Sequence, residues 1–153
     1  MPDADAAKEL ADYIAAHLPL ATAMGVVVRE AGDAQVVLDV PLAPNLNHEQ
    51  TAFGGSIAAS GMLAGWGLIW LRARRLAPMP RLVIAQSETR YIRPLEADFE
   101  ARCEWPRQDA WEQAAASIER HGRAKIPLRT ELQLNRRTAA VHDGTFVVIA
   151  TTP

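Results

Sequence analysis

The stretch Asn45–Arg75, NLNHEQTAFGGSIAASGMLAGWGLIWLRARR, decides the fold. It begins with a polar loop that contains two asparagines and His48. The turn Phe53-Gly54-Gly55-Ser56 follows, and no charged residue occurs after it until Arg72. We predict a long buried helix over residues 55–77. The first N–H groups of a helix lack partners within it, and the helix dipole favours negative charge there. The glycine pair therefore marks a candidate site for polarising a carbonyl group.

Length and composition limit the possible classes of protein. The chain has 153 residues, of which 49% are hydrophobic, and a formal net charge of −2. These values favour one domain over residues 1–153 and argue against a nucleic-acid-binding protein. The single cysteine, Cys103, excludes an intrachain disulfide and a cysteine-based zinc site. The acidic N-terminus lacks the basic flank of a signal peptide. We therefore expect a cytoplasmic protein that needs no metal.

Arginine dominates the basic residues, since Lys8 and Lys125 are the only lysines among 16. Codon bias in a GC-rich genome is one explanation. Phosphate recognition is the other, because the guanidinium group pairs with phosphate in a bidentate way. Two sequence groups are candidates for holding a polyphosphate: Arg72, Arg74 and Arg75, and Arg120, Arg123 and Lys125.

Hydrophobic periodicity and turn residues predict three helices and six strands. We expect helices over 4–18, 55–77 and 109–121, and strands over 25–29, 34–40, 82–93, 98–105, 124–134 and 138–150. The last strand is interrupted at Asp143-Gly144, where we favour a β-bulge over a tight hairpin. Pro127 cannot donate to a strand ladder and indicates an edge or a bulge.

The long apolar segment has two interpretations. Residues 51–71 carry no charge, so a membrane span is one of them. Glycine, serine and threonine dilute the segment, however, and alternating half-buried strands follow it. We favour the buried centre of a globular α+β fold, in which a curved antiparallel sheet covers the helix.

The segments around this helix resemble a known family. The residues that carry the likeness are Pro44–Asn47, Thr51–Ser56, Trp66, Tyr91–Leu95, Asp98–Ala101 and Gly122–Ile126. Over residues 18–150 the chain resembles the hotdog fold, and locally the subfamily named for the thioesterase domain at the C-terminus of YiiD. The resemblance implies a curved antiparallel sheet around a long central helix. It also implies pairing of two such units across the sheet edge.

The resemblance further implies hydrolysis of an acyl thioester on coenzyme A or an acyl-carrier protein, without a cofactor. In related hotdog thioesterases an asparagine lies seven residues before the first glycine of a His-Gly-Gly motif, and Asn47 has that relation to Gly54. Phe53 replaces the histidine. Met62 stands where a catalytic carboxylate usually lies on the helix, with Ser60 and Gly61 beside it, and no acidic residue follows on this helix.

Thioester hydrolysis needs a polarised carbonyl, a positioned water and a base. We predict that the N–H of Gly54 or Gly55 binds the carbonyl oxygen, unless the glycine pair serves only to begin a helix. Asn47 is expected to hold water, with an Asx turn as the alternative. His48 is a candidate base, because imidazole accepts protons near neutral pH, although a loop histidine is often simply exposed.

A second candidate base lies on the strand over residues 82–93. We expect Gln86, Glu88 and Arg90 to share a face with Leu82, Ile84 and Ile92. Glu88 would then face the helix start of a partner subunit, where burial raises the pKa of a carboxyl group. An ion pair between Glu88 and Arg90 is the alternative.

Further residues are candidates for substrate contact. They are Asn45, Thr51, Phe53, Ser56, Ser60, Met62, Arg90 and Arg93. Ser56 is alternatively a helix cap, and Ser60 lacks the Gly-x-Ser-x-Gly context of a nucleophile. Apolar helix residues such as Met62 and Trp66 line an acyl tunnel or belong to the core.

The leading hypothesis is a homodimeric or tetrameric acyl-thioesterase that acts on acyl-CoA or acyl-carrier protein and does not bind membranes or nucleic acid. A non-catalytic acyl-CoA-binding module and a hydratase or dehydratase of the same fold are the alternatives.

Overall fold

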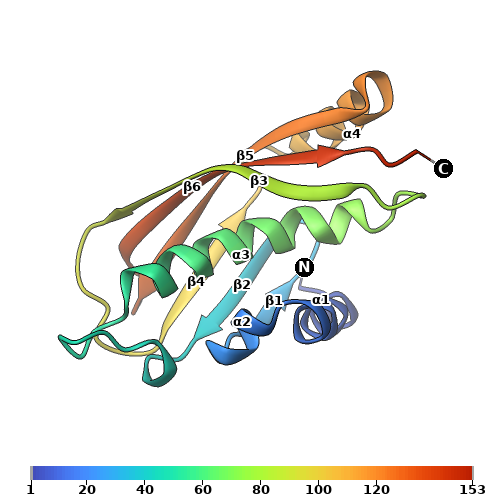
Figure 1. The fold of residues 1–153 in the computed structure, drawn as a ribbon. Coiled ribbons are helices and arrows are strands. Elements are labelled where there is room, and N and C mark those ends of the chain that lie inside the picture. Colours follow the sequence, from blue (N-terminus) through green and yellow to red (C-terminus); the bar gives the residue numbers. More distant parts are fainter. Residues whose placement is uncertain (1, 153) are drawn as a thin grey trace.

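The computed structural model describes residues 2–152 and is centred on one helix, α3, which spans Gly54–Ala73. Figure 1 shows α3 lying across one face of a sheet that bends around it. More than half of its residues are buried. In the described residues, α3 is the one helix long and apolar enough to cross a membrane. However, 56% of its apolar segment is buried inside the protein, as in the core helix of a globular fold.

Six antiparallel strands form a single sheet in the order β1-β2-β4-β5-β6-β3. They are Val27–Ala31 (β1), Gln35–Val40 (β2), Arg81–Tyr91 (β3), Phe99–Glu104 (β4), Arg123–Leu134 (β5) and Arg137–Ile149 (β6). This arrangement confirms the predicted α+β class, in which a curved antiparallel sheet wraps a central helix.

Side chains alternate between the two faces of the sheet, as predicted. Phe99, Ala101 and Cys103 of β4 are buried under α3, while the residues between them are partly exposed. Thr130 of β5 is also buried, and its Oγ1 donates a 2.9 Å hydrogen bond to the carbonyl oxygen of Gly61 in α3. The alternation therefore places α3 directly on the inner face.

The remaining helices lie at the edges of this unit. They are α1 (Ala4–His17), α2 (Pro19–Ala23), the 3₁₀ turn η1 (Ala43–Asn45) and α4 (Ala110–His121). Leu10 and Ile14 bury one face of α1. Pro127 lies in the part of β5 that β4 does not reach, because β4 pairs only with residues 130–133. Its missing N–H therefore costs no ladder bond, which confirms the predicted edge.

Helix α3 ends four residues earlier than predicted, and ion pairs hold its end. Arg72 donates to the carbonyl oxygen of Asp33 at 3.2 Å, and an Arg75 nitrogen lies 3.0 Å from the Asp33 carboxylate. Arg74 pairs with Glu9 of α1. Burial alone would raise the pKa of Asp33, but Arg75 and Arg72 outweigh it and lower that pKa. This arginine group thus fastens α3 to the β1–β2 turn and to α1.

The position of the bulges corrects the prediction for the last strand. Asp143 and Gly144 pair in regular register on both sides of β6. The extra residues are Ala139 in β6, opposite β5, and Ala85 in β3, where Ile84 pairs with Phe146 but Gln86 pairs with Thr145. The Asp143-Gly144 prediction is therefore wrong, because these two residues continue the ladder.

The bulge at Ala85 also corrects the predicted face of Glu88. It reverses the alternation of β3. Beyond it, Glu88 pairs with Asp143, and Arg90 pairs with Val141. These partners lie on the face opposite to His142 and Phe146, whose side chains contact α3. Gln86, Glu88 and Arg90 therefore point away from α3 in this chain, and they do not share a face with Leu82 and Ile84.

Candidate active site

The start of α3 presents backbone donors that no side chain caps. Phe53 is the N-cap residue, with an extended backbone (φ −63°, ψ 132°), and its side chain makes no capping hydrogen bond. The N–H groups of Gly54, Gly55 and Ser56 fall in the first helical turn, where no backbone acceptor exists within the helix. Ser56 is thus not the cap that the sequence suggested. These N–H groups form a site for an anion or a polarised oxygen.

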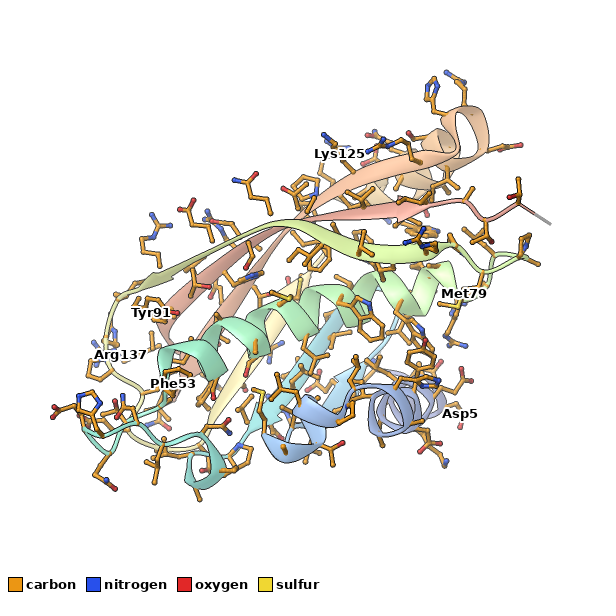
Figure 2. The ribbon with its side chains drawn as sticks, viewed as in Figure 1. Asp5, Phe53, Met79, Tyr91, Lys125 and Arg137 are labelled. Atoms are coloured by element: carbon orange, nitrogen blue, oxygen red, sulfur yellow. The ribbon has the colours of Figure 1, made fainter. Side chains whose placement is uncertain are left out.

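Two exposed aromatic side chains flank this glycine pair (Figure 2). The hydroxyl of Tyr91 donates a 2.8 Å hydrogen bond to the carbonyl oxygen of Gly54. A Cβ on Gly54 would lie 3.3 Å from that hydroxyl, and a Cβ on Gly55 would lie 2.4 Å from the ring of Phe53. The sequence interpretation assigned these glycines to carbonyl access. The structure adds a packing reason, because the aromatic rings occupy the space of the missing side chains.

The loop before α3 is organised by the side chain of Asn47. Its Oδ1 accepts the N–H groups of Glu49 and Thr51 at 2.9 and 3.0 Å, and its Nδ2 donates to Thr51 Oγ1 at 2.8 Å. Nδ2 also lies 3.4 Å from the carbonyl oxygen of Ala52. These bonds form the Asx-type turn that was the alternative interpretation. In this conformation both N–H donors and both acceptor positions of the Asn47 amide are engaged within the loop. The orientation of a water molecule by Asn47 remains a prediction.

Two predicted substrate contacts are buried. Asn45 is 2% exposed, and its Nδ2 donates to the carbonyl oxygens of Met24 and Pro41 at 2.8 and 2.7 Å. Ser60 is fully buried and donates to the carbonyl oxygen of Ser56 at 2.7 Å. Both side chains hold the backbone of the fold together. This corrects the expectation that they touch substrate.

An apolar groove of about 460 Å³ begins at the glycine pair and runs along the exposed stripe of α3. Its helix side is formed by Gly55, Ala58, Met62 and Trp66, and its walls are formed by residues of α2, β3 and β6. These wall residues include Leu20, Met24, Leu82, Ile84 and Phe146. Met62 therefore lies where the sequence predicted an acyl tunnel. A hydrocarbon chain that entered at the helix start would displace water from an apolar surface.

The other predicted residues lie on the loop before α3 and on or beside β3, outside the lining of the groove. The side chain of His48 is 87% exposed on the loop, 3.3 Å from the Glu49 carboxylate. Glu88 is exposed on the outer face of β3. Arg93 follows β3, and its backbone N–H donates to the carbonyl oxygen of Ala139. Arg137 is the first residue of β6, two residues before Ala139, and the sequence interpretation did not single it out. It lies near the helix start in Figure 2.

Sequence interpretation also missed a buried histidine under α3. His142 is 1% exposed, and its Nε2 lies 2.8 Å from Ser87 Oγ. A Cβ on Gly61 would stand 2.5 Å from the Cβ of His142. Burial lowers the pKa of His142. The sequence did carry a signal: His142 alternates with Ala140, Gly144 and Phe146, which are all apolar. The helix that covers this strand has glycines at positions 61 and 65, where it meets His142 and Phe146.

The geometry agrees with comparisons to known proteins. The family model described as "Putative thioesterase (yiiD_Cterm)" matches residues 7–150. A structure described as a "putative thioesterase" from Shewanella oneidensis is 27% identical, with a TM-score of 0.83, over 95% of this chain and 98% of that one. A Chlorobaculum tepidum protein of unknown function is 25% identical, with a TM-score of 0.87, over 95% and 94% of the two chains. A Pseudomonas aeruginosa protein described as a "Probable Thioesterase" is 18% identical, with a TM-score of 0.82, over 99% of both, and shows the shared fold.

The chain belongs to the YiiD C-terminal thioesterase family, since the family model covers nearly all of it. Its fold is the hotdog fold of the thioesterase structures that it matches.

Proposed function

We propose that this protein hydrolyses an acyl thioester to a free acid and a thiol. One observation carries the proposal: the uncapped start of α3 opens directly onto an apolar groove. The carbonyl oxygen of the thioester would accept the N–H of Gly54 or Gly55, and its acyl chain would follow the groove toward Trp66. Donors placed where negative charge develops lower the barrier for attack on the carbonyl carbon.

A water molecule then attacks the carbonyl carbon, and the thiolate leaves. No acidic residue lies on α3 to accept the proton of this water. We propose His48 as the base, because it lies on the loop that leads into the helix start and its ring is open to solvent. Glu88 faces outward from its own subunit, so it would have to act from a second copy of the chain.

Arginines near the entrance support a substrate that bears phosphate. Arg93 and Arg137 lie on neighbouring segments, since the carbonyl oxygen of Ala139 accepts the N–H of Arg93. Arg90 lies on the outer face of β3 nearby. Coenzyme A and the carrier-protein prosthetic group share pantetheine and phosphate, and arginine suits phosphate. We propose that these arginines hold that phosphate.

A second copy of the chain is proposed to pair with the open edge of β3. Among residues 2–152, this 11-residue strand pairs on one side only, with β6. Val83, Tyr91 and Ile92 are exposed on or beside it, at 41%, 53% and 50%. Long unpaired edges with apolar side chains favour pairing with another strand. Homodimerisation would cover this edge beside the groove.

A non-catalytic acyl-thioester-binding module is the second candidate, and the absence of a carboxylate on α3 favours it. Release of free thiol from a panel of acyl-CoA and acyl-carrier-protein thioesters separates the two. Turnover that saturates with substrate supports hydrolysis. Saturable binding without thiol release establishes the binding module instead.

A further inference from the structure

The apolar groove has a defined length along α3. The helix residues that line it recur every three or four positions, from Gly55 through Ala59 and Met62 to Trp66. Positions with this spacing share one face of a helix, so the groove follows the helix axis. Trp66 is the last of them, and it lies roughly 16 Å from Gly55 at about 1.5 Å per residue.

A second cavity, of about 330 Å³, continues beyond Trp66. Three residues line both cavities: Trp66, Leu82 and Val83. The second cavity is also lined by Trp70, one turn further along α3, and by Arg81, one residue nearer to the start of β3. It therefore lies past Trp66 on both elements. Among the residues of α3, Trp66 alone lines both cavities, so its indole ring lies between them.

Aromatic contacts hold this indole ring in place. Its centroid lies 5.9 Å from that of Tyr13 in α1 and 6.1 Å from that of Trp70, and the planes are inclined by 28° and 26°. Tyr13 in turn stacks on His17 at 4.1 Å. Stacked aromatic pairs add to the stability of their arrangement. The ring of Trp66 therefore forms a fixed wall at the end of the groove.

We propose that Trp66 sets the upper length of the acyl chain, and that the preferred substrates carry chains of about 10–14 carbons. This inference rests on the proposed function. An extended chain advances about 1.2 Å per bond, since a three-bond residue of an extended backbone spans about 3.3–3.6 Å. A span of roughly 16 Å, less about 3.5–4 Å for contact with the indole ring, accommodates a chain of this length.

The test measures the dissociation constants of non-hydrolysable alkyl thioethers of coenzyme A, from hexyl to octadecyl. We expect Kd to fall by about 4-fold or more for each added pair of methylene groups as far as the decyl to tetradecyl members. Beyond that point Kd should level off or rise, because further methylene groups meet Trp66 and stay in water. An affinity that increases without a break to octadecyl would overturn the proposal.

Removal of the indole ring should lengthen the chain that fits. Trp66→Ala joins the two cavities, and Trp70 lies roughly 6 Å further along α3. We expect the break to move up by about four carbons, with Kd for the octadecyl thioether at least about 10-fold lower than in the wild type. Trp105→Ala is the matched control, because Trp105 packs near Trp111 outside both cavities. An unchanged break in folded Trp66→Ala would overturn the proposal.

A larger side chain nearer to the glycine pair should have the opposite effect. Met62 lines the groove one turn before Trp66 and is partly exposed, so a bulky side chain there enters the groove. Met62→Trp should move the break down by about four carbons. This variant tests the same placement of the chain if Trp66→Ala does not fold, and a break at the wild-type length would overturn it.

Thiol release from the matching acyl-CoA series separates this inference from the proposed function. If no thioester is hydrolysed but the break in Kd moves with the substitutions at Trp66 and Met62, hydrolysis fails and the chain-length role stands. If the thioesters are hydrolysed but Kd shows no break, the chain-length role fails alone. The absence of binding for every thioether would overturn both.

Discussion

Gly61 of α3 lies against the side chain of His142, so closely that a Cβ at position 61 would stand 2.5 Å from the Cβ of His142. Gly61 and His142 are both buried, so neither α3 nor β6 can move to make room without disturbing the packing around them. This contact sets the distance between α3 and the sheet at the level of Ser87.

The first prediction concerns this contact. Gly61→Ala should lower the free energy of unfolding by about 1–3 kcal/mol, because it overpacks a filled interface. Gly67→Ala is the matched control, since a Cβ there would lie 3.1 Å from the flexible end of Leu10 and 3.8 Å from Val36 Cγ1, which is an ordinary van der Waals distance. Alanine also gains up to about 1 kcal/mol of helix propensity over glycine. Urea unfolding of both variants checks this, and equal stabilities would contradict it.

The second prediction isolates the N–H of Gly54. Proline is tolerated at the first position of a helix, and the extended backbone of Phe53 suits a residue before proline. Gly54→Pro removes the N–H, whereas Gly54→Ala keeps it and introduces the same Cβ near Tyr91. We expect kcat of the proline variant to be about 10²-fold below that of the alanine variant. Equal kcat values would show that this N–H does not bind the carbonyl.

The third prediction concerns the loop at Asn47. Asn47→Ala removes the hydrogen bonds of the side chain and should reduce kcat/KM by at least about 10-fold through disorder of the helix entrance. Asn47→Asp keeps the oxygen that accepts from Glu49 and Thr51 and should retain more activity. Thiol release and circular dichroism of both variants check this. Full activity of Asn47→Ala would contradict it.

The fourth prediction concerns phosphate recognition. Replacing Arg93 and Arg137 by alanine should raise KM for acyl-CoA by about 10-fold and leave KM for the matching N-acetylcysteamine thioester unchanged, because that thioester lacks phosphate. Lys125→Ala is the control. It pairs with Val147, near the opposite end of β6 from Arg137. A rise in KM in the control alone would place the phosphate on the other basic group.

The fifth prediction uses the buried imidazole. Burial lowers the pKa of His142, and the Asp143 carboxylate offsets this only in part. The unfolded chain therefore binds the proton of this residue at a higher pH than the folded chain does. Stability should be fully present above about pH 6.5 and should decrease as the pH falls through the folded pKa. His142→Gln should remove this part of the decrease between about pH 7 and 5 in urea unfolding, and parallel curves would contradict it.

The central helix and the alternating strands could be predicted because each has a strong local signal. Residues 55–71 carry no charge, and the residues around Ala101 and Ile126 alternate strictly. The site was harder to predict. The roles of Asn45 and Ser60 depend on whether their polar atoms meet solvent or backbone, and neither composition nor spacing reveals that.

The faces of β3 could not be predicted for a different reason. Strict alternation would place Glu88 on the same face of the sheet as Ile84. The pairing of β3 with β6 interrupts this alternation at Ala85. A bulge is a property of two paired strands, and no residue of β3 signals it by type. For the same reason Ser87 was not recognised as an inward-facing hydroxyl.

The surplus alanine at position 85 has a consequence for reading relatives of this chain. It reverses which face of the sheet each later side chain of β3 occupies. As a result, a serine, a threonine and a tyrosine face the helix, and a glutamate and an arginine face outward. In a homologue that lacks this one residue, the later side chains of the strand would face the opposite side of the sheet, with hardly any change in composition. Ligand preference in such sequences should therefore be compared only after the two strands have been aligned as a pair.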